Sequence, residues 1–276
     1  MMTLSELRTE LERIIRYESV FRTVDTNELN RYINHAYRDL AAWSYALISL
    51  QTYQVGGGPD DYPHQVRINR NGLIGQVLDF QPVGLIAPYH LMWHRGTVRI
   101  SLRPALYIRP EILLENADRA RRAPTPIDEY PAPVPNTRFL PQHKLVQEEY
   151  EHPHEFVFHN GFCLLRPAPR IISGNAGQLW VYGAFVPMPI GSVPPAFPIL
   201  INDSDLCRLP ILLAQHLPDV AYYYYARAIT DLYPVAVQRY QAARELALYY
   251  RQQLIQDAIQ GIPFDQNSSQ PDRRKR

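Results

Sequence analysis

Histidine supplies the only pattern in this sequence that resembles a metal site. His152 and His154 stand two residues apart around a proline, and His159 follows shortly after. On a strand, residues at i and i+2 project to the same side, and imidazole is a common zinc ligand. No cysteine or carboxylate clearly completes the set, although Glu151 and Glu155 are near. Histidines that are exposed, or that find hydrogen-bond partners in the core, explain this pattern better than a metal site does. A metal-dependent hydrolase is the weaker alternative.

Two other pairs of potential ligands have simpler explanations. His90 and His94 have the i, i+4 spacing of a helical metal pair, but Pro88 and the aromatic neighbours suit a loop or a strand. Asp203 and Asp205 form a D-x-D pattern that could bind a cation, but the rest of an EF-hand is absent. Turn formation and helix capping just ahead of the next helix explain the two aspartates better.

Nucleotide-binding and nucleophile motifs are absent from the sequence: it has no G-x-G-x-x-G, no P-loop lysine motif and no G-x-S-x-G. The glycine-rich GGGPDDY at 56–62 ends in two acids, which repel phosphate, so it predicts a turn. We therefore expect no catalytic residues, no cofactor and no metal, and we do not expect an enzyme.

Composition limits the class of protein. The chain has 276 residues, of which 46% are hydrophobic, which suffices for a sizeable core in one large or two smaller domains. A formal net charge of +1 gives no global bias towards nucleic acid or anionic membrane. Two cysteines, Cys163 and Cys207, suggest free thiols in a reducing compartment. Prolines break the one long uncharged stretch, 171–202, so we expect a soluble, intracellular chain with no membrane helix.

Both ends of the chain have helical periodicity. Thr3 and Glu6 have the spacing of a capping box, and an apolar stripe follows them to residue 15. Asp25 and Glu28 repeat that spacing before a second stripe that ends near Trp43. Two short helices packed as a hairpin are the expected result.

Helix returns near residue 206. Pro218 and Pro234 stand at first-turn positions of two further helices, and the second has helical spacing up to a stop signal at Gly261. Beyond it, the polar residues 261–276 end in four basic residues and predict a flexible basic arm.

The middle of the chain is β-rich. Short candidate strands are separated by glycine, proline or asparagine signals: LISLQTYQV, VLDF, TVRISL, FVFH, FCLLRP and QLWVYGAFV. Residues 119–141 are proline-rich without a period and predict an exposed loop. The expected fold class is α+β: a discontinuous helical scaffold from 1–45 and 205–260, with a β-rich, proline-rich insertion at 46–204.

Four consecutive tyrosines, Tyr222 to Tyr225, lie on the helix that Pro218 begins. Successive helical residues point about 100° apart, so four rings cannot all face one core. A core helix that uses tyrosine as filler is the simplest interpretation. Tyrosine also suits a surface that is partly packed and partly wet, so we predict a subunit interface that includes Tyr222, Tyr223, Tyr225 and Tyr249.

Three segments together resemble the head-to-tail connector, or adaptor, proteins of tailed bacteriophages. The first is TLSELRTELERIIRY with DTNELNRYINHAYRDLAA, which resembles that family's N-terminal helix pair. The second is FHNGFCLLRPAPRIISGNAGQLWVYGAFVPMP, with strand, Pro-Ala-Pro turn and strand. The third is INDSDLCRLPILLAQHLPDVAYYYYARAI, with an acidic turn, a Leu-Pro step and a Tyr/Ala-rich helix. They cover about half of the chain, and residues 55–150 depart from the family pattern.

The resemblance implies a structural virion protein that forms a ring, typically of twelve copies, between portal and tail. It implies assembly in the host cytoplasm and a position at the head–tail junction of the virion. It also implies transient contact with packaged DNA. A near-neutral body without a basic stripe suits a passage that should not hold the DNA. The expected partners are sister copies, the portal, and tail, nozzle or fibre proteins. Family members reach the portal with an extended C-terminal segment, and that role would fall here to Phe264, Arg273, Arg274, Lys275 and Arg276. Another tail, nozzle or fibre-attachment protein is the alternative.

Overall fold

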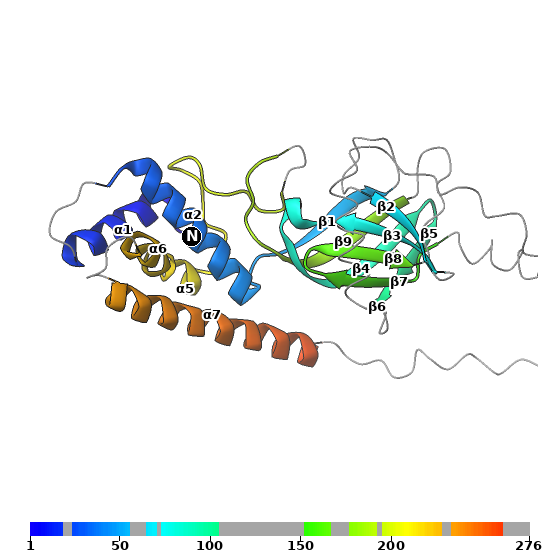
Figure 1. Cartoon of the computed structure of the whole chain (residues 1–276). Helices are drawn as coiled ribbons and strands as arrows, with labels where there is room; N and C mark the ends of the chain where they lie inside the picture. Colours follow the sequence, from blue (N-terminus) through cyan, green and yellow to red (C-terminus); the bar gives the residue numbers. More distant parts are fainter. Residues whose placement is uncertain are drawn as a thin grey trace, which may run out of the picture.

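The structure, a computed structural model, describes residues 1–18, 24–55, 65–70, 73–104, 152–166, 177–191, 195–227 and 233–261. These residues form a helical lobe, built from both ends of the chain, and a β lobe from its middle (Figure 1). The α+β fold class that the sequence predicts is confirmed. The predicted loop at 119–141 and the predicted arm beyond Gly261 lie outside the described residues.

The helices begin and end close to where the periodicity places them. They are α1 (Leu4–Glu18), α2 (Thr26–Ser44), the short α5 (Ile211–Ala214), α6 (Leu217–Ala226) and α7 (Tyr233–Gly261). The capping box is present, because the Glu6 backbone N–H donates to the Thr3 hydroxyl over 3.2 Å and the Thr3 N–H to the Glu6 carboxylate over 2.8 Å. Asp25 occupies the N-cap of α2, but its side chain makes no capping hydrogen bond.

Helix α6 forms the centre of the helical lobe. It packs against α1, α2 and α7, and one continuous core joins the four helices. α1 contributes its leucines, α2 contributes Ile33 and Tyr37, and α7 contributes the small residues Ala236, Ala243 and Ala247. Alanines let the α7 backbone approach α6 closely, so a helix of 29 residues lies flat along the bundle (Figure 1).

Two sheets form the β lobe. The four-stranded sheet has the order β1 (Ile48–Val55), β9 (Gly177–Phe185), β4 (Leu85–Arg95) and β5 (Val98–Ser101). The five-stranded sheet has the order β2 (Gln65–Arg70), β3 (Leu73–Asp79), β8 (Phe162–Arg166), β7 (Glu155–His159) and β6 (Arg103–Pro104). A 3-10 turn, η1 (Gln81–Val83), precedes β4. All six strands expected from the sequence are present; β2 and β6 were not expected, and β4 had been left as a loop or strand.

A second core fills the space between the two sheets. Trp93, Leu91 and Val181 from the four-stranded sheet meet Leu78 and Leu165 from the five-stranded sheet, and all five side chains are buried. The two sheets therefore pack face to face as a sandwich.

One turn in the sandwich follows directly from its sequence. The hairpin of β7 and β8 turns through Asn160 and Gly161, both with positive φ. Asn-Gly is the pair that a two-residue hairpin turn favours.

The lobes are joined at the start of β1 and the end of β9. The Phe185 N–H donates to the Leu47 carbonyl over 2.8 Å, and Phe197 packs against both cores. None of the described helices has the length and apolar composition needed to cross a membrane.

Candidate functional site

The four tyrosines of α6 contact different parts of their own chain. Tyr222 is fully buried and Tyr225 is 5% exposed, and their rings stack at 6.2 Å inside the helical core. The tertiary packing of α1 and α2 over this face of α6 encloses them. These two residues cannot offer a surface to another subunit, so their place in the predicted interface is wrong.

Tyr223 points to the seam between α6 and α7. Its ring lies 4.1 Å from that of Tyr240 and 5.7 Å from that of Tyr233, and Trp43 of α2 meets Tyr240 edge-on at 5.1 Å. Tyr223 is half-buried by this aromatic cluster. Its proposed contact with a sister copy stays a prediction, limited to the edge of the ring that remains exposed.

Tyr224 hydrogen-bonds to a carboxylate on a distant helix. Its hydroxyl donates to Asp39 Oδ2 of α2, and its ring lies 5.4 Å from that of His35. Burial raises the pKa of Asp39 above its usual 3.8, although the Tyr224 hydrogen bond lowers it in part. Burial and the Asp39 contact likewise raise the pKa of the Tyr224 hydroxyl. The pair links α2 to α6 across 185 residues of sequence, a spacing that no sequence pattern could reveal.

Replacing Asp39 with asparagine is expected to remove a pH dependence of stability. A carboxyl whose folded pKa lies above its unfolded value binds its proton more tightly in the folded state, so its ionisation lowers stability as the pH rises above 3.8. Asp39→Asn keeps an acceptor for the Tyr224 hydroxyl but carries no charge. Urea unfolding at a series of pH values should show the variant gaining stability relative to the parent as the pH rises.

The variant Tyr224→Phe is the matched control for that experiment. Tyr224→Phe removes the hydrogen bond that partly lowers the pKa of Asp39. As the pH rises, the variant should therefore lose more stability than the parent does. If the parent instead gained stability relative to Asp39→Asn as the pH rises, the result would contradict the argument.

Arg239 fixes the start of α7 on the bundle. Its guanidinium donates to Asp219 of α6 over 2.9 Å and to Glu18, the last residue of α1, over 2.8 Å. All three side chains are only about a fifth to a third exposed, which limits solvent screening. One side chain thus holds three helices in register.

The opposite face of α7 is exposed and almost uncharged. We call it the α7 stripe: Val235, Gln238, Gln241, Ala242, Glu245, Tyr249, Gln252 and Gln256. These positions recur at helical spacing on the side away from the buried alanines, and Glu245 is the only charged residue among them. Tyr249 is 57% exposed, and the Gln253 amide donates to its hydroxyl over 2.6 Å. Of the four predicted interface tyrosines, Tyr249 is the one that lies fully on the surface.

Helix α2 has a different exposed face. Arg31, His35 and Arg38 stand at i, i+4 and i+7 and are all exposed. Arg31 is 3.6 Å from Glu28, a weak surface pair. The sequence predicts a body without a basic stripe, and two exposed arginines on α2, one of them paired with Glu28, leave that expectation a prediction.

A groove lies between α1 and the corner of α5 and α6. Its volume is about 800 Å³. Its apolar lining consists of Met1, Met2, Ile14, Ile211 and Pro218, and its charged lining consists of Glu6, Glu10, Arg13, Asp219 and Arg239. We call it the α1 groove. It shares no residue with the α7 stripe.

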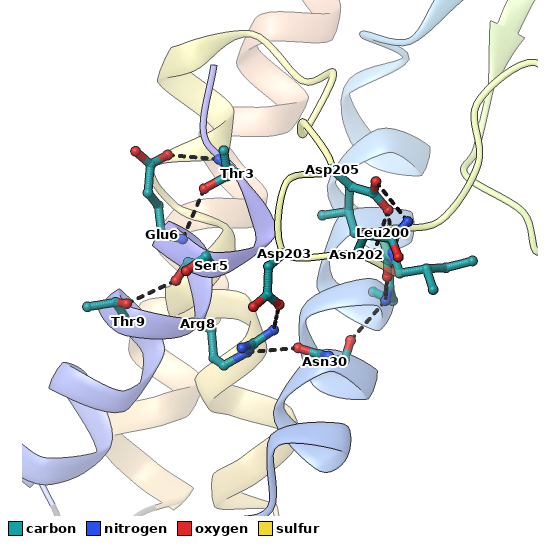
Figure 2. Close-up of polar contacts among 12 residues, drawn as sticks. Thr3, Ser5, Glu6, Arg8, Thr9, Asn30, Leu200, Asn202, Asp203 and Asp205 are labelled. Carbon is teal, nitrogen blue, oxygen red and sulfur yellow. Dashed lines mark hydrogen bonds and ion pairs between the residues drawn. The ribbon is translucent and has the colours of Figure 1, made fainter.

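The D-x-D pair has a structural role in the turn before α5 (Figure 2). The carbonyl of Asp203 accepts the N–H of Ser5, and the carbonyl of Asp205 accepts the N–H of Leu4, both in the first turn of α1. The Asp203 carboxylate accepts a hydrogen bond from Arg8 over 2.6 Å. The Asp205 carboxylate accepts the N–H groups of Asn202 and Ile201, which lower its pKa. The expected turn is confirmed, but the expected capping of the next helix is wrong: the N-cap of α5 is Pro210, and the two aspartates bond instead to their own turn and to α1.

The histidines are spread over separate parts of the sandwich. His90 contacts Ser101 at 2.8 Å, His94 lies beside Trp180, and His152 packs on Trp93 at 4.6 Å. Within the described ranges, no three histidine, cysteine, aspartate or glutamate side chains are grouped as metal ligands would be.

The arm residues Phe264, Arg273, Arg274, Lys275 and Arg276 lie outside the described residues, so their predicted contact with a portal stays a prediction. In the comparisons with known proteins, no family model and no curated protein matched this chain.

Proposed function

We propose that this protein is a structural virion protein, a head-to-tail adaptor that assembles as a ring between portal and tail. The observation that carries the proposal is the α7 stripe. On the side of α7 opposite its buried alanines, the positions of this stripe hold glutamine, alanine, valine and tyrosine with Glu245 as their single charge. Protein interfaces are depleted in charge at their centre and enriched in tyrosine, whereas solvated helix faces are rich in charge.

A ring needs two different surfaces on each copy. Head-to-tail contacts join one patch to another patch on the next copy, and they close when the rotation between copies allows it. The α7 stripe is convex, and the α1 groove is a concave surface with apolar and charged lining. The two patches share no residues, so one copy can present its stripe to the groove of the next copy, as a heterologous contact requires.

The resemblance to phage connector proteins supplies the location and the partners. It rests on the helix pair at the N-terminus and the Tyr-rich helix, and the structure joins both into one bundle. A ring of twelve copies is the expected size. The α2 row of Arg31, His35 and Arg38 is short, so contact with passing DNA should be weak and salt-sensitive.

A tail, nozzle or fibre-attachment protein is the second candidate. The observation in its favour is the size of the β lobe, which has its own core and exposes Leu50, Tyr89 and Tyr182 on one sheet. Deleting residues 110–145 separates the two candidates: loss of tail assembly with intact portal docking favours this one.

The assembly state is the direct test of the adaptor proposal. Light scattering on the purified chain, alone and with the portal of the same virus, should give the mass of an oligomer in at least one condition. Negative-stain images of the mixture should show a ring coaxial with the portal. A chain that stays monomeric in both conditions and leaves the portal bare would exclude the adaptor role.

Truncation after Gly261 is expected to abolish portal docking without loss of the fold. The fifteen residues removed contain Phe264 and the basic end Arg273 to Arg276, which the resemblance assigns to the portal contact. Circular dichroism should be unchanged, because the buried core residues that α7 contributes among the described residues end at Ala247, well before the cut. A pull-down with portal measures the loss; a variant that lacks only the four basic residues shows whether charge or Phe264 dominates. Equal binding by full-length and truncated chains would refute the arm.

A further inference from the structure

Among the described strands, the four-stranded sheet of the sandwich has two edges, β1 and β5, with no strand paired on their outer sides, and these two strands run in opposite directions. Its order is β1, β9, β4, β5, and each neighbouring pair is antiparallel. An even number of alternating strands makes β1 and β5 antiparallel to each other. A second copy, related to the first by a rotation, can therefore add its four strands to this sheet. Its β1 would lie next to β5 of the first copy and antiparallel to it.

The composition of β1 favours pairing at its edge. Its eight residues, ISLQTYQV, contain no charge and no proline. Natural edge strands are usually protected by lysine, proline, a bulge or a short length. No described strand pairs with the outer side of β1, and none of these protective features occurs within it.

The composition of β5 argues against pairing between two β5 edges. It has only four residues, VRIS, and Arg99 is exposed on it, so β5 is itself a partly protected edge that can pair over four residues and only with an uncharged partner. Two β5 strands side by side would bring two Arg99 side chains into the same small contact, which is unfavourable. An uncharged β1 opposite β5 has no such conflict.

The strand registers show which residues would meet. Thr52 pairs with Trp180, Trp180 with Met92, and Met92 with Ser101, so Thr52 and Ser101 belong to one row across one face of the sheet. Ile48 and Leu50 are the other residues of β1 on that face that can lie opposite Ser101 while all four residues of an antiparallel β5 stay within β1. In a continued sheet, Ser101 would lie opposite one of these three β1 residues.

We propose that the edge of β1 pairs with the edge of β5 from a second copy of this chain, head to tail, so that the four-stranded sheets of neighbouring copies join. This contact rests on the proposed ring, and it adds a strand pairing to the helical contacts. Because β1 and β5 are different surfaces, the pairing is directional, as a closed ring requires.

Engineered cysteines test the contact in the full-length chain. Ser101→Cys is combined in turn with Ile48→Cys, Leu50→Cys and Thr52→Cys. Within one chain, positions 52 and 101 are separated by three strand spacings of about 4.8 Å each, too far for a disulfide. Native Cys163 and Cys207 are buried, and burial raises the pKa of both thiols, to about 11 for Cys207, so they should stay unreactive.

On mild oxidation, at least one double variant should form a ladder of covalent species from dimer upward. A mixture of the two matching single variants should stop at dimers, and each single variant alone should remain uncrosslinked. Rings that form without crosslinks in all three double variants would overturn the strand pairing and leave the adaptor proposal intact. Covalent dimers of Thr52→Cys alone would also overturn it, because they require β1 to pair with β1. A chain that is monomeric with and without portal overturns both proposals.

Discussion

Replacing Tyr222 with alanine should destabilise the helical lobe by about 3–5 kcal/mol, the range typical of large aromatic truncations in a core. Tyr222 is fully buried at the centre of α6, against α1 and α2. Its ring stacks on Tyr225, which in turn meets Tyr32 edge-on at 6.4 Å. Alanine would leave a cavity that the surrounding helices can fill only in part. Urea unfolding followed by far-UV circular dichroism measures the loss.

The matched variant Tyr222→Phe should behave in the opposite way. The Tyr222 hydroxyl is buried and has no hydrogen-bond partner in the part of the chain that the structure describes. An unsatisfied buried polar group costs about 1–3 kcal/mol, so its removal should leave stability unchanged or increase it. If Tyr222→Phe proved as destabilising as Tyr222→Ala, the hydroxyl would be engaged in the folded protein and the assignment of this side chain to a dry core would be wrong.

Introducing a charge into the α7 stripe should disrupt assembly while the fold is retained. Ala242→Glu places a carboxylate near the middle of the stripe, on the side of α7 away from Ala243 and the core. A buried unpaired charge at an interface costs several kcal/mol, so assembly should weaken by about 100-fold or more. Analytical ultracentrifugation over a concentration series gives the change, and the thermal unfolding of the monomer should shift little.

Two further variants make that result specific. Asn27→Glu adds the same charge at an exposed position in the first turn of α2, where an acid is favourable, and should leave assembly unchanged. Glu245→Gln removes the only charge of the stripe and should preserve or strengthen assembly. Normal assembly of Ala242→Glu, or equal weakening by Asn27→Glu, would show that the stripe is a solvated surface.

The sequence was most informative where a local rule decides the structure. The capping box at Thr3 and Glu6 and the prolines that begin α6 and α7 depend on residues within one turn of each other. The same holds for the Asn160–Gly161 hairpin. Each is governed by short-range backbone geometry, so the residue types suffice.

The pairing of distant strands could not be read in this way. β1 lies beside β9, more than 120 residues later in the chain, and β9 separates it from β4. Alternation identifies a strand, but the choice of neighbour is decided by which apolar faces close one core. That β1 and β5 are the outer strands of their sheet among the strands that the structure describes, and with it the proposed pairing between copies, therefore follows only from the tertiary structure.

The tyrosine row shows the same division within a single helix. By itself the sequence determined that Tyr222 to Tyr225 lie on a helix and point in four directions. Only the packing of α1, α2 and α7 around α6 decided that Tyr222 and Tyr225 enter the core, that Tyr224 reaches Asp39, and that Tyr223 closes the seam with α7. Helical periodicity fixes angles about one axis, whereas burial depends on neighbours brought from nearly 200 residues away in the chain.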